Sequence, residues 1–348
     1  MPRRLLVPVI ASLAATLTCV ISITGCTSAA GNASTSQPAS TGQPTSTGQP
    51  TSTGQPAVAG RPAVASLPAS SSQPAIASQP AATSRPAATS GPTGVQYYLA
   101  LGDSLAAGYQ PQQEADQGYA NQLDARLRSH GRVLSLDNLA CSGETTQTMI
   151  QGGVCSYPSE PDQLQAALDF LHAHKGHVPL ITIDIGGNDM SSCNSLTSVS
   201  AADACTESLI PAMNKNLAAV LKALIAADPS AVITGLNYYV PELAGWLDGS
   251  SGPALVAAQL SATKVMNAAL ASDYKAVGAR TVDVFSTFQS DDLTGKTTVP
   301  GYGSVPIAVA RVCEWTWMCS AEDEHANTEG YGVIAAAIYS VLPANIAE

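Results

Sequence analysis

Five short apolar runs, separated by stretches with helical periodicity, are the feature that most constrains the fold of this 348-residue chain. Each run is a near-continuous series of large apolar residues, which is typical of strands in a parallel sheet covered on both faces. Because helical stretches separate the runs, the sequence predicts an α/β fold, a three-layer α/β/α sandwich with a parallel sheet of about five strands. The predicted strands are 96–101, 133–139, 180–185, 231–236 and 280–284.

Apolar residues at helical spacing fill the intervals between these strands. The predicted helices are 118–130, 163–172, 209–227 and 254–277, with a last helix at 328–341. All of these elements lie from residue 96 onward, and the segment 96–348 has a normal length for one α/β domain.

The first 26 residues are typical of an export signal. Arg3 and Arg4 precede an apolar stretch from Leu5 to Ile23, and small residues then lead directly to Cys26. This ending resembles the lipobox of bacterial lipoproteins, in which the cysteine is lipidated and becomes the first residue of the mature chain. We expect a signal peptide over 1–26, lipidation of Cys26, and contact with a membrane through that lipid anchor only. A plain signal peptide, giving a secreted protein, or a retained anchor helix is the alternative.

Residues 27–95 consist largely of Ala, Ser, Thr, Pro, Gly and Gln, and the hexad TSTGQP at 45–50 is repeated at 51–56. A segment with frequent proline and few large apolar side chains cannot bury enough surface to offset the entropy lost on folding. The composition therefore predicts a disordered tether between the export signal and the domain at 96–348.

The charge of the chain is unevenly distributed. Residues 1–95 hold four of the 15 Lys and Arg residues and no acidic residue, so 11 basic residues face 26 acidic ones from residue 96 onward. A nucleic-acid partner needs a basic face, and the domain has the opposite sign. We therefore expect no nucleic-acid partner, and the chain is predicted to act as a monomer on a small-molecule or lipid substrate.

Six cysteines lie in the predicted domain, in three pairs that are close in sequence. An oxidising compartment and short separations favour local disulfides over the other connectivities. A zinc site is the alternative, but no Cys-x-x-Cys spacing occurs, and the sequence predicts no metal and no cofactor. The predicted pairs are Cys141 with Cys155, Cys193 with Cys205, and Cys313 with Cys319.

Four polar segments lie just after a predicted strand or just before a predicted helix. Because the carboxyl ends of parallel strands meet at one edge of a sheet, these segments are expected to come together there. They are Gly102-Asp103-Ser104, Asn138 to Thr146 with Gly143 inside it, Ile185-Gly186-Gly187-Asn188-Asp189, and Glu322 to Asn327 with His325 inside it.

In these four segments the chain resembles the secreted GDSL or SGNH serine esterases and lipases, whose four sequence blocks occur in the same order. The resemblance covers residues 96–348 and implies a flavodoxin-like α/β/α sandwich that hydrolyses carboxylic esters through an acyl-enzyme. It implies that Ser104 is the nucleophile and His325 the general base. It also implies an oxyanion hole built from the backbone N–H groups of Ser104 and Gly143 and the side-chain amide of Asn188.

The group that orients His325 is less defined by the sequence. The family usually has an aspartate three residues before the histidine, and Glu322 occupies that position here, with Asp323 one residue later. Glutamate is able to orient an imidazole, so we favour Glu322 over Asp323. Some family members use a backbone carbonyl instead, which is a third alternative.

The expected function is that of an exported serine hydrolase acting on carboxylic esters of lipids or short acyl chains. A carbohydrate O-deacetylase of cell-wall or plant polysaccharide uses the same site chemistry and is the enzymatic alternative. A non-catalytic cell-surface binding lipoprotein is the alternative from another class. Trp315, Trp317 and Met318, close in sequence to His325, are either pocket residues or local core.

Overall fold

The computed structural model describes residues 94–111 and 117–348. The predicted signal peptide, the lipidation site at Cys26 and all but the last two residues of the predicted tether lie outside these ranges.

The five predicted strands form one parallel sheet, which confirms the predicted fold class. The strand order is β2-β1-β3-β4-β5, the order of flavodoxin-like folds. Each strand begins and ends within a few residues of its predicted position. The strands are β1 (Tyr97–Gly102), β2 (Ser135–Asn138), β3 (Leu180–Asp184), β4 (Val232–Leu236) and β5 (Arg280–Val282).

Long helices cover both faces of this sheet, so the architecture is the predicted three-layer sandwich. The long helices are α2 (Tyr119–Ser129), α4 (Gln163–Ala173), α5 (Val199–Ala227), α6 (Gly252–Ala276), α8 (Ile307–Trp315) and α10 (Thr328–Val341). The short helices are α1 (Ser104–Ala107), α3 (Thr148–Gln151), η1 (Asn188–Cys193), η2 (Pro241–Asp248), α7 (Val284–Thr287), α9 (Met318–Ala321) and α11 (Ala344–Ala347).

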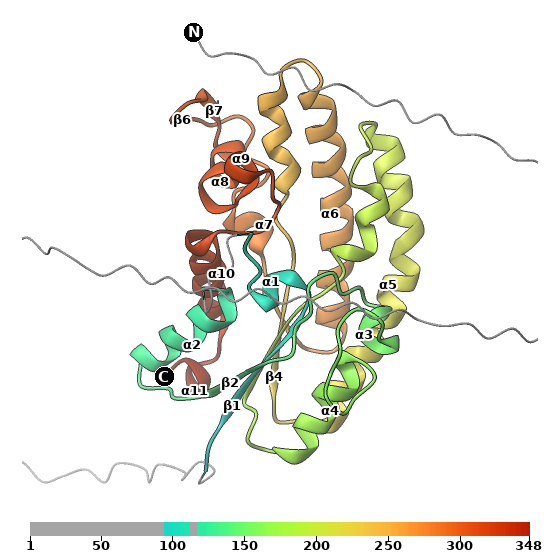
Figure 1. The fold of residues 1–348 in the computed structure, drawn as a ribbon, viewed down its shortest axis with the longest axis vertical. Coiled ribbons are helices and arrows are strands. Elements are labelled where there is room, and N and C mark those ends of the chain that lie inside the picture. Colours follow the sequence, from blue (N-terminus) through green and yellow to red (C-terminus); the bar gives the residue numbers. More distant parts are fainter. Residues whose placement is uncertain (1–93, 112–116) are drawn as a thin grey trace, which may run out of the picture. The chain divides into compact units, whose positions relative to one another are not determined.

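Alternation along β1 divides the hydrophobic core into two layers. Tyr98 and Ala100 point to one face of the sheet, where they join the buried residues of α2 and α10. Leu99 and Leu101 point to the other face and join the buried residues of α4, α5 and α6. Figure 1 shows the same division, with α2 and α10 on one side of the strands and α4 and α5 on the other.

The sequence placed the start of α5 too late. The helix was predicted from residue 209, where the helical spacing of apolar residues was taken to begin. In the structure the helix begins at Val199 and Pro211 lies inside it. Ala202 and Thr206 are buried in the extra turns, so tertiary packing there outweighs the hydrogen bond that proline cannot donate.

A β-hairpin and the helix that follows it were not predicted. The hairpin pairs β6 (Lys296–Val299) with β7 (Gly303–Pro306) in antiparallel fashion. Helix α8 follows directly and buries Ala308, Val309 and Val312. The two strands are short, and all three elements lie outside the repeating strand-helix pattern, so hydrophobic periodicity gave little signal for them.

Helices α5 and α6 are long and apolar enough, by length and composition alone, to cross a membrane. Their buried residues, among them Leu217, Leu221 and Leu270, pack in the core layer that covers the sheet. Core helices of soluble domains meet the same criterion, so the finding gives no separate support for a membrane span.

The end of β1 lies unusually close to the end of β3. Gly102 has a φ of 129°, and a Cβ atom at this position would lie 1.9 Å from the carbonyl oxygen of Asp184. The next residue, Asp103, donates its backbone N–H to the same oxygen at 3.0 Å. Glycine is therefore required at position 102 for the chain to turn beside β3 and enter α1.

We predict that Gly102→Ala loses at least about 3 kcal/mol of unfolding free energy, because the added methyl group forces β1 and β3 apart. Urea unfolding followed by circular dichroism measures the loss. Gly278→Ala is the matched control, since Gly278 also has a positive φ of 74° but has open space around its Cβ position. An equal loss in the two variants would contradict the close-approach argument.

Candidate active site

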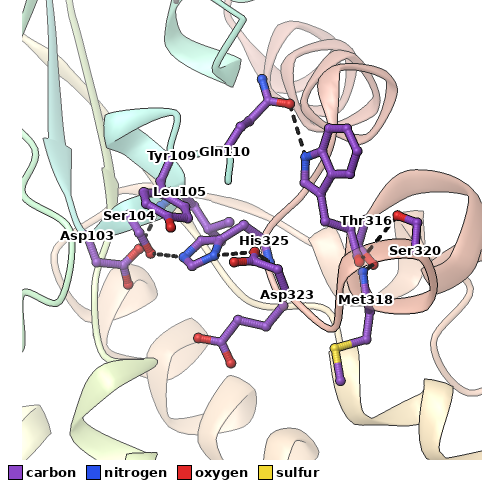
Figure 2. A network of polar contacts seen from close by, with 12 residues as sticks. Asp103, Ser104, Leu105, Tyr109, Gln110, Thr316, Met318, Ser320, Asp323 and His325 are labelled. Carbon is purple, nitrogen blue, oxygen red and sulfur yellow. Dashed lines mark hydrogen bonds and ion pairs between the residues drawn. The ribbon is translucent and has the colours of Figure 1, made fainter. Parts of the chain in front are cut away.

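Three side chains predicted from the sequence meet at the carboxyl edge of the sheet. The Nε2 atom of His325 lies 2.8 Å from the Oγ atom of Ser104, and its Nδ1 atom lies 2.8 Å from Oδ1 of Asp323. Figure 2 shows the imidazole between the hydroxyl and the carboxylate. Both contacts are hydrogen bonds when Nδ1 carries the ring proton, so that Ser104 donates to Nε2 and Nδ1 donates to Asp323.

Ser104 is positioned by the turn between β1 and α1. Asp103 caps this helix, and its Oδ1 atom accepts the backbone N–H of Leu105 at 3.0 Å. Its Oδ2 atom accepts the hydroxyl of Tyr238, which follows β4, at 2.7 Å. The serine therefore stands on a turn that is held by its own helix cap and by a side chain that follows β4.

Asp184, at the end of β3, is a second carboxyl group under this turn. It accepts the backbone N–H of Ala106 at 3.3 Å and the hydroxyl of Tyr119, and its side chain is hydrogen-bonded to that of Asp103. Burial, followed by the charge of Asp103, raises the pKa of Asp184 well above its usual value. Two buried carboxyl groups in contact do not both ionise, so Asp184 retains its proton. Asp184 was not predicted as a site residue, and its sequence signal is that of a lone acidic residue at the end of an apolar strand.

Gln163, the first residue of α4, supports the same turn from the other side. Its Oε1 atom accepts the N–H of Gly102 at 2.7 Å, while its Nε2 atom donates to the carbonyl of Gly102 at 2.9 Å and to the Glu144 carboxyl at 3.2 Å. The amide therefore pairs with Gly102 much as another strand would. It also links the end of β1 to the loop that carries Gly143.

His325 is held by backbone contacts on both sides. The backbone N–H of Trp317 donates to the carbonyl of His325 at 2.9 Å, and Thr316 forms an isolated antiparallel bridge with Ala326. The ring of Tyr109 lies 4.4 Å from the imidazole, centroid to centroid. These contacts fix the segment before α10 against the end of α8. They hold His325 beside Ser104, which lies 221 residues earlier in the sequence.

The preference for Glu322 as the partner of His325 was wrong, because Asp323 makes the contact. The Oδ1 atom of Asp323 accepts both the ring Nδ1 and the backbone N–H of His325, the latter at 3.0 Å. An aspartate readily bonds the backbone two residues ahead, and this local turn brings its carboxylate to the ring. Glu322 is exposed in a left-handed turn with φ of 55°, and its carboxylate has no hydrogen bond within the part of the chain that the structure describes. The backbone of the same turn is held by Tyr239, whose hydroxyl donates a hydrogen bond to the carbonyl of Glu324.

The two remaining predicted site residues lie on adjacent loops. Asn188 begins η1 after β3, and its Nδ2 atom donates to the carbonyl of Glu144 at 2.9 Å. Gly143 immediately precedes Glu144 and has a positive φ of 84°, a turn that favours glycine. An amide nitrogen carries two protons, so Asn188 has a second N–H for another acceptor.

Disulfides join the loops that carry these residues. The structure contains the three predicted pairings, Cys141 with Cys155, Cys193 with Cys205, and Cys313 with Cys319. The first lies beside Gly143, the second closes the end of η1 after Asn188, and the third closes the segment before His325. Each crosslink restricts a loop whose displacement would move a site residue.

A cavity of about 130 Å³ opens from Ser104, Asn188 and His325 toward α5, α6 and η2. Its further lining residues come from segments for which the sequence offered no motif: Ser191, Asn194, Thr206, Tyr238, Tyr239, Glu242, Gln259, Ala262, Thr263, Met266 and Glu324, with others. Trp315, Trp317 and Met318 are not among the lining residues. Trp317 instead donates its indole N–H to Gln110 at 3.2 Å, as Figure 2 shows.

Within residues 94–111 and 117–348, no group of three or more His, Cys, Asp or Glu side chains is arranged to hold a metal ion. The site places a hydroxyl, an imidazole and a carboxylate in line, next to a cavity.

Glu242 is a partly buried acid in the wall of this cavity. Burial raises its pKa from the usual 4.5 to about 7, and the charge of Glu324 adds to the shift. Because the folded protein then holds a proton that the unfolded chain has released, the free energy of unfolding falls as the pH rises from about 4.5 to about 7. A shift of this size corresponds to a loss of about 3 kcal/mol above this window.

We predict that Glu242→Gln, which is neutral at every pH, loses less stability than the parent chain when the pH is raised from 5 to 8. Urea unfolding at both pH values measures the difference. The exposed Glu207→Gln, on α5, serves as the control and should follow the parent. The same pH dependence in Glu242→Gln and the parent would show that the carboxyl is already ionised at pH 5.

The chain resembles several solved structures of lipolytic enzymes. An extracellular lipase from Streptomyces rimosus is 21% identical, with 71% of this chain and 100% of that chain covered and a TM-score of 0.47. A phospholipase A1 from Streptomyces albidoflavus NA297 is 17% identical, with 72% and 100% covered and a TM-score of 0.43. A psychrotrophic esterase from Pseudoalteromonas sp. is 19% identical, with 70% and 95% covered and a TM-score of 0.39.

Among curated proteins, none matches the sequence. Residues 100–333, more than half of the chain, match the GDSL-like Lipase/Acylhydrolase family, and the match includes Ser104, Gly143, Asn188 and His325. The chain therefore belongs to the GDSL-like lipase/acylhydrolase family, a family of ester hydrolases.

Proposed function

We propose that the chain hydrolyses carboxylic esters through an acyl-enzyme on Ser104. The observation that carries this proposal is the pair of 2.8 Å contacts that His325 makes, one to the Ser104 hydroxyl and one to the Asp323 carboxylate. A hydroxyl is a poor nucleophile until a base removes its proton, and an imidazole accepts that proton near neutral pH.

In the acylation step, the Ser104 oxygen forms a bond to the ester carbonyl carbon while its proton passes to Nε2 of His325. The resulting imidazolium is stabilised by the carboxylate of Asp323. Collapse of the tetrahedral intermediate breaks the bond to the alcohol oxygen, which leaves with the proton from His325. A water molecule then repeats the sequence on the acyl-enzyme and releases the carboxylic acid.

The tetrahedral intermediate carries a negative charge on the former carbonyl oxygen, which needs preorganised donors. We assign this role to the backbone N–H groups of Ser104 and Gly143 and to the second amide N–H of Asn188. The bond from Asn188 to the Glu144 carbonyl supports this assignment, because it fixes the orientation of the amide. Each such donor is typically worth about 3 kcal/mol of transition-state stabilisation.

Carbohydrate O-deacetylation is the second candidate function. The polar side chains that line the cavity favour it, because they are able to bind the hydroxyl groups of a sugar. A non-catalytic binding role is disfavoured, since a binding protein has no need of a serine, a histidine and an aspartate in line. Export fits the three disulfides, which persist in oxidising compartments. The lipid anchor on Cys26 and the monomeric state stay predictions from the sequence.

We predict that Ser104→Ala abolishes hydrolysis of 4-nitrophenyl acetate, lowering kcat by at least about 10³-fold, because among the described residues Ser104 alone offers a hydroxyl to Nε2 of His325. A fluorophosphonate probe should label the parent chain and leave Ser104→Ala unlabelled. An unchanged melting temperature is the control for folding. Retained hydrolysis in the folded variant would overturn the assignment of the nucleophile.

We predict that Asp323→Asn lowers kcat by about 10²- to 10⁴-fold, because an amide does not stabilise the imidazolium. Glu322→Gln is the matched control. It should leave kcat within about twofold of the parent value, because the Glu322 side chain is exposed and makes no contact with the His325 imidazole. Initial rates on 4-nitrophenyl acetate measure both. If neither substitution lowers kcat, the carboxylate has no part in orienting His325.

A further inference from the structure

The far wall of the cavity carries polar groups that the protein itself leaves without hydrogen-bond partners. Gln259 is 2% exposed, and its Nε2 atom donates to the carbonyls of Cys193 and Leu196 at 3.0 and 2.9 Å. Both amide protons are thereby used, and its Oε1 atom has no partner among residues 94–111 and 117–348. The fixed amide presents an unused acceptor to the cavity that Gln259 lines.

Hydroxyl groups lie in the same wall. Thr206 on α5 is 1% exposed, and Thr263 on α6 is also a lining residue. Neither hydroxyl has a hydrogen bond within the described residues, and the same is true of the side chains of Ser191 and Asn194. Gln259 and Thr206 are buried, Thr263 and Asn194 are partly buried, and Ser191 is exposed. None of their unpaired polar atoms is sealed from solvent. The free acceptor of Gln259 and the hydroxyl of Thr206 are therefore open to a ligand or to water in the cavity.

The charge of the lining narrows the ligand class. Asp103, Glu242 and Glu324 line the cavity, and none of the lining residues within the described part of the chain is Lys or Arg. An anionic ligand would meet like charges there. Because burial raises the pKa of Glu242 to about 7, this carboxyl is able to donate a hydrogen bond to a neutral ligand.

The wall is also held in place before any ligand arrives. The disulfide between Cys193 and Cys205 joins the end of η1 to α5, directly beside Thr206. The amide of Gln259 bonds the carbonyl of the same Cys193, which ties α6 to the same point. Donors and acceptors on such a rigid frame discriminate between ligands better than mobile ones do.

We propose that this cavity is a subsite for a hydroxyl-bearing, uncharged part of the ester substrate, with Glu242, Gln259 and Thr206 as specificity-determining residues. The proposal rests on the proposed ester hydrolysis at Ser104. A hydroxyl both donates and accepts, so it satisfies the Oε1 atom of Gln259 together with the groups of Thr206 and Glu242. An alkyl group of the same size fills the space and leaves all of them unpaired.

The test compares kcat/KM in two substrate series, because the hydroxyl group can belong to either half of the ester. The alcohol series is glycerol monobutyrate, butyl butyrate and butyrylcholine, and the acyl series is 4-nitrophenyl 3-hydroxybutyrate and 4-nitrophenyl butyrate. We expect the hydroxylated ester to exceed its alkyl analogue by at least about tenfold in one series, which identifies the half that the subsite binds. No such preference in either series, or a preference for the cationic choline ester, would overturn the proposal.

Three variants connect this preference to the named side chains. Thr206→Val keeps the shape of the side chain and removes its hydroxyl, and Glu242→Leu removes the carboxyl. Each should reduce kcat/KM for the preferred hydroxylated ester several-fold while leaving the alkyl ester unchanged or faster. Glu242→Gln keeps a neutral donor and should retain most of the preference. Glu207→Leu, exposed beside Thr206, is the control, and an unaltered preference in both Thr206→Val and Glu242→Leu would overturn the assignment.

A binding measurement separates failure of the subsite from failure of the proposed function. Ser104→Ala is titrated with glycerol monobutyrate, 3-hydroxybutyrate esters and their alkyl analogues by NMR. If the parent hydrolyses no ester and takes no fluorophosphonate label, the proposed function fails, while preferential binding of hydroxylated esters here would still support the subsite. If the parent hydrolyses esters but Ser104→Ala binds the alkyl analogues equally well, the subsite fails alone.

Discussion

The close approach of the ends of β1 and β3 is the constraint on which the site depends. Gly102 brings its backbone against the carbonyl of Asp184, where a Cβ atom has no room, and the next residue donates to that carbonyl. The side chains of Asp103 and Asp184 are thereby brought together in the core, and both bond to the first turn of α1. Ser104 stands on that turn, so its position follows from strand pairing rather than from a flexible loop.

The other half of the site comes from a segment more than two hundred residues later, and its placement depends on different contacts. The hydrogen bonds between α8 and the segment before α10 fix the backbone of His325. The disulfide between Cys313 and Cys319 closes the same region. Loop segments seldom hold a side chain to the accuracy that proton transfer needs, and here a covalent crosslink and a backbone bridge supply that rigidity.

The sheet and the four site segments could be predicted because their signals are local. An apolar run predicts a strand, and the small and polar residues after it indicate a turn at the edge of the sheet. The choice between Glu322 and Asp323 could not be predicted, since both carboxylates lie close to His325 in sequence. Which of them contacts the imidazole depends on a backbone turn that forms only in the folded chain. The start of α5 was predicted too late for a related reason, because the first turns of the helix are held by tertiary packing of residues such as Ala202 and Thr206. The cavity wall lacked any signal, as Thr206, Glu242 and Gln259 share no motif and meet only when α5, η2 and α6 assemble.

The distribution of protons in the site follows from its lack of cationic side chains. No Lys or Arg is among the described residues that line the cavity. Burial raises the pKa of Glu242 in the cavity wall, and burial together with the charge of Asp103 raises that of Asp184 beneath the turn that carries Ser104. The one positive charge that the proposed reaction creates is the His325 imidazolium, which forms beside Asp323. A positive charge there also favours the ionised form of Asp103, which lies under the nucleophile. The carboxylate of Asp323 therefore stabilises the positive charge that appears on His325 when Ser104 gives up its proton.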